Sequence, residues 1–145
     1  MPLIPFSTTL HVRDTCLCLH AQRAARALAR RFDMALKPTG LTNQQFSLMM
    51  ALNRPEPPPM GPVAKLLAMD RTTLTAALKP LSARGWVSIE PDPKDKRGKR
   101  LKLTAQGAMA LASAVPIWKE VHAEIEAGMT SDPQALRQGL MEVSG

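Results

Sequence analysis

Apolar residues recur every three or four positions across residues 12–37, and this spacing predicts one long amphipathic helix. The stripe consists of Leu17, Ala21, Ala24, Leu28, Phe32 and Leu36. Pro38 and Gly40 follow, and both residue types end helices. Residues 1–10 carry no such period, so they are expected to form a loosely packed arm.

A second helix is expected after Thr42, because Gln45 stands three residues later and the pair forms a capping-box pattern. This helix ends near Asn53. Its apolar residues are Phe46, Met49, Met50 and Leu52. Five prolines between positions 55 and 62 then predict a stiff connector, since proline is excluded from a helix interior.

Residues 63–104 read in order as helix, turn, helix, strand, charged hairpin and strand. Gly85 suits the left-handed position that ends the second of these helices. Apolar and polar residues then alternate over residues 86–90 and again over 101–104, which predicts two half-buried strands. The polar hairpin between them has Gly98 near its tip. This order is that of a winged helix-turn-helix, a unit that reads DNA.

Two more helices are expected after the hairpin. Thr104 is placed to N-cap a long helix that Gly128 closes, and Pro116 inside it predicts a kink. Asp132 followed by Pro133 starts a short final helix. The sequence therefore predicts six helices and one β-hairpin, a mainly α fold.

The central segment resembles one bacterial family in the order of its motifs. Asp92-Pro93-x-Asp95-x-Arg97, followed by Leu101-x-Leu103-Thr104-x-x-Gly107, is similar to the wing signature of the MarR family of transcriptional regulators. The preceding Asp70-Arg71-Thr72-Thr73-Leu74-Thr75, with Leu81-x-x-Arg84-Gly85, resembles that family's recognition helix and its exit. With the flanking helices, the resemblance covers nearly the whole chain.

The resemblance implies an organisation and a function. Residues 1–145 are expected to form a single domain, with a winged helix-turn-helix at 42–104 and dimerisation helices at 12–37 and 105–143. The implied protein is a homodimeric regulator, a repressor, that binds double-stranded DNA at a pseudo-palindromic operator. Two-fold symmetry would place two recognition helices in successive major grooves, about 34 Å apart.

The expected recognition helix presents a polar face for base reading. Arginine can take guanine with two hydrogen bonds, a threonine methyl can pack on a thymine methyl, and lysine more readily reaches phosphate. The expected contacts are Arg71, Thr72, Thr73, Thr75, Ala76 and Lys79. Helix capping is the alternative role for Thr72 and Thr73, and Asp70 is the expected cap itself. Pro80 predicts a bend in this helix.

The hairpin concentrates cationic side chains. The wing residues expected to serve DNA binding are Lys94, Asp95, Lys96, Arg97, Lys99 and Arg100. Arg97 is expected to enter the minor groove, whose negative potential deepens in narrow A·T stretches. The resemblance implies that Asp95 orients this arginine through a salt bridge without touching DNA. The alternative is a solvated hairpin whose charges only deter edge pairing.

The distribution of charge agrees with a polyanionic partner. The formal net charge is +7, and residues 63–104 hold ten of the 19 Lys and Arg but only four of the 12 Asp and Glu. Residues 105–145 hold two Lys or Arg and five Asp or Glu. Such a localised excess is typical of a nucleic-acid footprint, although a basic surface that only aids solubility is the alternative.

A crevice between the dimerisation helices and the winged unit is the expected place for a small-molecule effector. Its expected lining residues are Phe46, Met49, Met50, Trp118 and His122. A ligand there acts only if it binds the DNA-competent and DNA-incompetent states unequally. The alternative is that these residues simply form core.

Cys16 and Cys18 have three alternative roles: core packing, oxidant sensing, or a metal site that includes His20. A cysteine near the start of the first helix resembles the peroxide-sensing branch of the family. That branch pairs its cysteine with tyrosines, and this chain has none. The resemblance therefore leaves the role of the two thiols open.

Several classes of protein are disfavoured. No phosphate-binding glycine loop, zinc-protease motif or acid–base carboxylate pair occurs, so an enzyme is not expected. No cofactor is expected either, and no metal apart from the open alternative at Cys16. No apolar run reaches the ~18 residues of a membrane span, and a signal-peptide pattern is missing, so a cytoplasmic protein is expected. The competing interpretation is a winged module that docks other proteins without specific DNA readout. Such a surface would be poorer in lysine and richer in aromatics than this hairpin.

Overall fold

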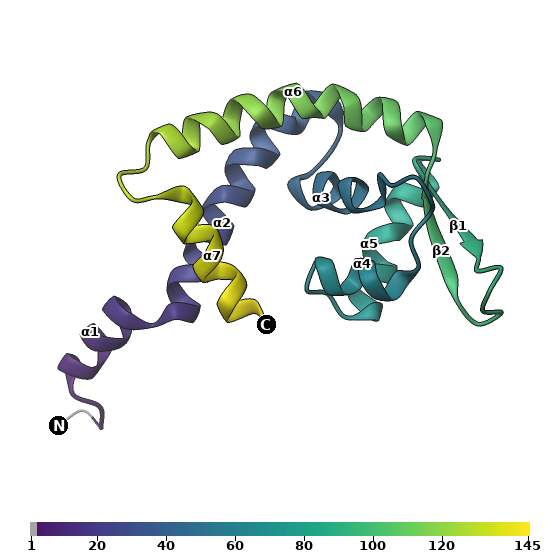
Figure 1. Ribbon diagram of the computed structural model, residues 1–145. Helices are drawn as coiled ribbons and strands as arrows, with labels where there is room; N and C mark the ends of the chain where they lie inside the picture. The colour runs from purple at the N-terminus through teal and green to yellow at the C-terminus, as the bar shows by residue number, and fades with distance from the viewer. Residues whose placement is uncertain (1–2) are drawn as a thin grey trace.

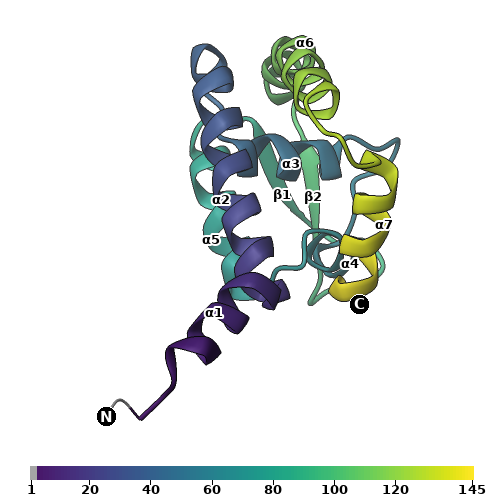
Figure 2. The same cartoon turned by 90° about the vertical axis from the view of Figure 1, so that its left-hand side faces the viewer.

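The computed structural model describes residues 3–145, which form a mainly helical fold with one antiparallel β-hairpin, as predicted. The elements in chain order are α1 (Phe6–Thr15), α2 (Leu17–Leu36), the 3-10 turn η1 (Lys37–Thr39), α3 (Asn43–Leu52), α4 (Met60–Leu66), α5 (Arg71–Ala83), β1 (Val87–Pro91), β2 (Lys99–Leu103), α6 (Ala105–Ala127) and α7 (Pro133–Ser144). In Figure 1, α6 runs along the top, with α3–α5 and the hairpin below one half and α7 below the other. Figure 2 shows that α2 and α7 stand apart from each other. No helix within residues 3–145 is long and apolar enough to cross a membrane.

The prediction of one helix over residues 12–37 is wrong, because the chain breaks at Cys16. The backbone of this residue is extended (φ −68°, ψ 110°), so α1 ends before it and α2 begins after it. Its thiol sulfur accepts a hydrogen bond from the Leu19 amide at 3.4 Å, which caps α2. The break raises the number of α-helices in the described chain from the predicted six to seven.

The arm expected over residues 1–10 is helical from Phe6 onward. It is nevertheless loosely packed, as expected, because α1 buries none of its residues against the rest of this chain. Residues 1 and 2 lie outside the described residues.

The core joins the winged unit to the inner ends of α2 and α6. Its largest fully buried side chains are Leu36, Leu48, Met49, Val63, Leu74, Leu78, Leu81 and Leu101. Leu36 lies in the last turn of α2, and Leu111 and Ala114 add the first half of α6. α7 buries nothing. The inner ends of α2 and α6 are thus built into the same core as the winged unit, while their outer parts and α7 project away from it (Figure 1).

Side-chain caps set where α3 and α5 of the winged unit begin, as predicted. Thr42 and Gln45 form the capping box of α3, with each side chain accepting from the other residue's amide at 3.2 and 3.1 Å. Asp70 caps α5 by accepting from the Thr73 amide at 2.7 Å. That hydrogen bond stabilises the carboxylate and lowers the pKa of Asp70.

Proline placement differs in part from the prediction. Pro62 was assigned to the connector but lies within α4, in a first turn whose amides have no partner inside the helix. α5 continues through Pro80, and α6 through Pro116. The bends expected at these two prolines stay predictions. Gly85 is left-handed (φ +75°) just after α5, which confirms its predicted role as a helix stop.

The hairpin register places Val87 opposite Leu103. The Asp92 amide donates to the Gly98 carbonyl at 3.0 Å, so Gly98 closes the base of the loop and does not stand near its tip as predicted. The proline connector also meets the hairpin, since the amide of Leu101 donates to the Pro58 carbonyl at 2.9 Å. This contact, which the sequence did not predict, covers the outer edge of β2.

Thr104 starts α6 as predicted and also ties it to the end of α5. Its hydroxyl accepts from the Gly107 amide at 3.0 Å and donates to the Gly85 carbonyl at 2.7 Å. A Cβ atom added at Gly107 would lie 2.1 Å from the Trp86 carbonyl oxygen. The contact leaves room only for glycine at this position of the motif.

Candidate nucleic-acid interface

α5 presents one buried face and one exposed face. Leu74, Leu78 and Leu81 anchor it in the core. All six residues expected to contact DNA on this helix lie on the exposed side, namely Arg71, Thr72, Thr73, Thr75, Ala76 and Lys79. The Asp70 cap orients the first turn of the helix, which carries Arg71, Thr72 and Thr73. Three threonine hydroxyls, a guanidinium and free helix-terminal amides are thus available to a polyanion.

The wing carries four cationic side chains that are free of partners in the described chain and exposed. They are Lys94, Lys96, Arg97 and Lys99. In both views the hairpin loop and the α4–α5 turn lie on the side of the winged unit away from α6 (Figures 1 and 2). A single ligand approaching that side would therefore meet both elements.

Arg100 differs from the other wing cations. Its Nε atom lies 3.3 Å from the Asp92 carboxylate, and the two side chains are only 21% and 12% exposed. Such a half-buried pair fixes the base of the loop and occupies the arginine. Arg100 is therefore less available to a ligand than the other four cations, and its expected role in DNA binding stays a prediction.

Asp95 also has a different role from the one expected. Its carboxylate accepts from the backbone amide of Arg97 at 3.0 Å, as in an Asx turn. Among the ion pairs of residues 3–145, the one within the wing joins Arg100 to Asp92, and none joins Asp95 to the Arg97 side chain. The implied Asp95–Arg97 salt bridge is thus corrected to a turn that shapes the backbone carrying Arg97.

Most of the expected effector-site residues gather between α3 and α6. The Phe46 and Trp118 rings stack with centroids 6.1 Å apart, and Trp118 stacks on His122 at 4.7 Å. A shallow hollow there includes Phe46, Met50 and Trp118 in its lining. Met49 is an exception, because its side chain is fully buried in the core.

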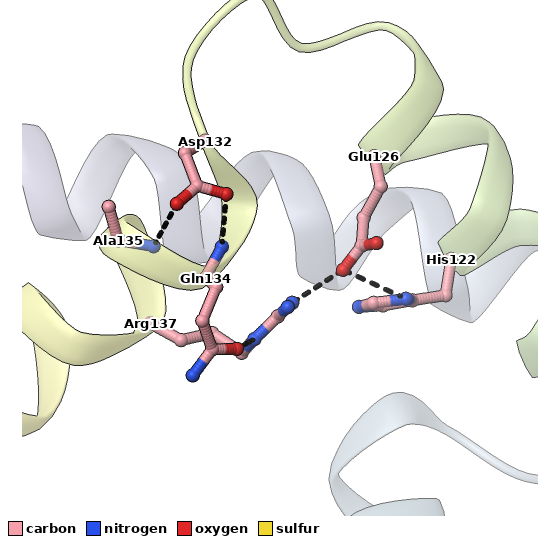
Figure 3. Close-up of polar contacts among 6 residues, drawn as sticks. All are labelled: His122, Glu126, Asp132, Gln134, Ala135 and Arg137. Carbon is pink, nitrogen blue, oxygen red and sulfur yellow. Dashed lines mark hydrogen bonds and ion pairs between the residues drawn. The ribbon is translucent and has the colours of Figure 1, made fainter.

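A polar chain extends from this aromatic stack to α7 (Figure 3). His122 Nδ1 lies 3.7 Å from the Glu126 carboxylate, which also accepts a hydrogen bond from Arg137. Asp132 caps α7 through the amides of Gln134 and Ala135, as predicted. Glu126 and Arg137 were not expected from the sequence, since their contact joins two helices across a turn.

The two cysteines lie at the junction of α1 and α2. Cys18 is exposed and Cys16 half-buried, so neither is a core residue within this chain. His20 Nδ1 lies 2.7 Å from the Cys16 carbonyl oxygen and not near its thiol. No cluster of three or more His, Cys, Asp or Glu side chains suited to a metal ion occurs in residues 3–145.

The outer helices expose an apolar surface. Large apolar side chains exposed on α1, α2 and α7 are Phe6, Val12, Leu17, Leu28, Met34, Leu136, Leu140, Met141 and Val143. Leu136, Leu140 and Val143 follow helical spacing and so form one stripe on α7. An apolar face of this kind marks an interaction surface. Below, the exposed apolar side chains of α1, α2 and α7 are called the outer face.

Comparisons with known proteins agree with this geometry. The sequence model described as "MarR family" matches residues 39–98. The multiple antibiotic resistance protein MarR of Escherichia coli is 30% identical over 114 residues, which are 78% of this chain and 79% of that protein. The HTH-type transcriptional repressor NicR of Pseudomonas putida is 32% identical over 56% of this chain and 51% of its own length. The crystal structure of the M. tuberculosis transcriptional regulator MosR in complex with DNA superposes with a TM-score of 0.82, at 37% identity, over 90% of this chain and 94% of the other.

Proposed function

Because this chain belongs to the MarR family of transcriptional regulators, we propose that it represses genes as a homodimer bound to a pseudo-palindromic operator. It is a DNA-binding regulator with the fold of MosR, which has been crystallised in complex with DNA. The proposal of repression is supported by the name of the related repressor NicR. We propose that it acts in the cytoplasm, because a regulator of this kind needs access to the chromosome. An enzymatic role is not proposed, since the related proteins are transcriptional regulators.

The observation that carries the proposed readout is the pairing of α5 with the wing. The α4–α5 turn, from which the exposed residues of α5 begin, and the hairpin loop that carries the free cations lie on the same side of the winged unit, away from α6 (Figure 1). In the proposed complex Arg71, Thr72, Thr73, Thr75 and Ala76 face bases in the major groove, and Lys79 reaches phosphate. Arg97 enters the flanking minor groove.

The homodimer is supported by the outer face. Its apolar side chains are half or more exposed within residues 3–145, or nearly so, and α7 buries none of its residues. A second copy that covers this face would remove the apolar surface from water. It would also supply the two-fold axis that a pseudo-palindrome requires.

Replacing Arg97 with alanine is the direct test of the wing. Loss of a minor-groove arginine should weaken operator binding by about 1–3 kcal/mol and reduce the salt dependence by about one ion. A mobility-shift titration at several salt concentrations, on duplexes selected from a random pool, measures both quantities.

The matched control is Lys119→Ala, which removes one exposed charge from α6, away from the wing. It should leave affinity within about twofold of the wild type, since a distant surface charge is largely screened. Unchanged affinity in Arg97→Ala would remove the wing from the mechanism. If neither protein discriminates between duplex sequences, the alternative of a protein-docking module is favoured.

We also propose that an effector relieves repression from the hollow beside Phe46, Met50, Trp118 and His122. The hollow lies between α3, which belongs to the winged unit, and α6, which leads to the outer face. A bound molecule would couple the winged unit to the outer face by binding more tightly to one of their relative positions than to another. The aromatic stack favours a flat, apolar ligand.

An oxidant is the second proposed input, because Cys16 has an extended backbone just before α2 and Cys18 lies in the first turn of that helix. The exposed Cys18 gives access to a peroxide, which would take two electrons as the thiols close a disulfide. Peroxide should therefore weaken operator binding by the wild type about tenfold, a coupling of ordinary size. The Cys16→Ser/Cys18→Ser double variant should not respond. Equal responses of both proteins in a mobility-shift assay would exclude this input.

A further inference from the structure

We propose that Arg84 is a positioning residue that fixes the recognition helix relative to the dimerisation helices. It would thereby set the half-site spacing that the dimer accepts, without touching DNA itself. The inference rests on the proposed function, because a preferred spacing exists only for a homodimer that reads two half-sites.

Arg84 joins two parts of the chain that lie 44 residues apart. It is the C-cap residue of α5, and its Nη1 atom donates to the Gly40 carbonyl oxygen at 2.7 Å. The flat face of its guanidinium lies over Trp86, with Cζ 4.3 Å from the ring centroid. One edge is thus hydrogen-bonded and one face stacked, which holds the guanidinium in a single orientation.

Gly40 is shaped to receive this contact. It follows η1 at the end of α2 in the left-handed conformation, with φ +76°. A Cβ atom added there would lie 3.3 Å from Arg84 Nη2 and 3.8 Å from the Trp86 ring. The turn that ends α2 therefore closes directly onto the arginine.

The same short segment also holds the beginning of α6. The Thr104 amide donates to the Trp86 carbonyl at 3.1 Å, and the Thr104 hydroxyl donates to the Gly85 carbonyl at 2.7 Å. Residues 84–86 are thus bonded to the end of α2 on one side and to the start of α6 on the other. We call residues 84–86, with Gly40 and Thr104, the junction.

Directional contacts at the junction matter because apolar packing alone is not directional. Leu74, Leu78 and Leu81 hold α5 in the core, yet a small rotation of this helix would keep them buried. The helix is 13 residues long, so its base-reading end lies about 20 Å from Arg84. A few degrees of rotation at the junction would displace that end by more than an ångström. In a dimer, the displacement is doubled by symmetry.

A phosphate contact is the alternative role of this exposed arginine, and the two roles give different results. A phosphate contact weakens binding to every duplex alike and contributes about one ion to the salt dependence. A positioning residue leaves the salt dependence unchanged and acts only where two half-sites must be met at once. Loss of its contacts relaxes the preference for one spacing.

The test compares operators that differ only in spacing. Mobility-shift titrations would use the selected operator and versions with one base pair inserted or deleted between the half-sites. The proteins are the wild type, Arg84→Ala, Arg84→Lys and a control, Arg54→Ala. Arg54 also bonds a backbone carbonyl, that of Ala51, but within one turn of its own helix end.

We expect Arg84→Ala to bind the native spacing about tenfold more weakly, with the spacing preference of the wild type reduced to about twofold. Arg84→Lys should recover part of the preference, because lysine can reach the carbonyl but cannot stack as a planar fork. Arg54→Ala should match the wild type. The spacing preference is the ratio of two affinities measured with the same protein sample. A smaller folded fraction lowers both affinities equally, so it does not change this ratio.

A spacing preference in Arg84→Ala equal to that of the wild type would overturn the inference. The inference would also be overturned if Arg84→Ala lost the same affinity for every duplex and its binding depended less on salt. That result would identify a phosphate contact. A wild type that lacks any spacing preference would contradict the proposed homodimeric readout itself. The two failures are therefore distinguishable.

Discussion

Replacing Gly107 with alanine is expected to destabilise the fold by about 2–4 kcal/mol, the cost of overpacking against a rigid neighbour. The new methyl group would lie 2.1 Å from the Trp86 carbonyl oxygen and 3.0 Å from Leu103 Cδ1. The carbonyl has no freedom to retreat, since it already accepts from the Thr104 amide. α6 would have to move away from the hairpin. In a helix without such a clash, alanine is more stable than glycine by about 1 kcal/mol. A net decrease in the free energy of unfolding would therefore be caused by the clash.

Thermal unfolding followed by circular dichroism at one fixed protein concentration measures this effect. The Tm of Gly107→Ala should fall by roughly 10 °C. Gly61→Ala is the matched control, because a Cβ atom there meets nothing within 4 Å. Its Tm should change by no more than a few degrees. A Tm of Gly107→Ala equal to that of the control would show that the α6–hairpin contact is looser than the structure indicates.

The Leu136→Asp/Leu140→Asp double variant is expected to be monomeric. Its affinity for the operator should fall by about 100-fold or more, since the winged units of two subunits are no longer linked. Both leucines are already about half exposed in the single chain, at 51% and 45%. The substitutions therefore cost the isolated chain little. In a dimer they would bury carboxylates without partners, which is strongly unfavourable.

Sedimentation velocity and mobility-shift titration on the same samples measure the two consequences together. Gln138→Asp is the matched control, because it adds one negative charge on the opposite side of α7. It should remain dimeric and bind the operator. A double variant that stays dimeric would place the subunit contact outside the α7 stripe.

The sequence predicted those features that depend on a few neighbouring residues. Thr42 with Gln45, Asp70, Thr104 and Asp132 all cap helices where expected, because each cap bonds amides two or three positions away. The polar face of α5 was equally accessible to prediction, since helical periodicity separates it from the buried leucines.

Features that depend on residues distant in the chain were missed. No proline or glycine marks the break at Cys16. Met49 was placed in the effector site because its spacing on α3 fits, but α3 is covered on more than one side. The Arg84–Gly40 contact spans 44 residues, and the sequence offers no signal for it.

For the wing, too, the sequence predicted the local character of the residues and missed their partners. Its cationic character was evident from composition, whereas the partner of each charge was not. Arg100 is taken by Asp92, and Asp95 shapes the backbone of the loop, which leaves Arg97 as the free arginine of the wing. Because two acidic residues hold the loop in shape, fewer of its conformations have to be lost on binding DNA.

The stoichiometry of the complex with the selected operator tests the central proposition most directly. Native mass spectrometry of the chain, alone and with one equivalent of duplex, would count the copies of each component. The account predicts a dimer in the free protein and two chains on each duplex. A free protein that remains monomeric at micromolar concentration, or a complex of one chain with one duplex, would contradict it.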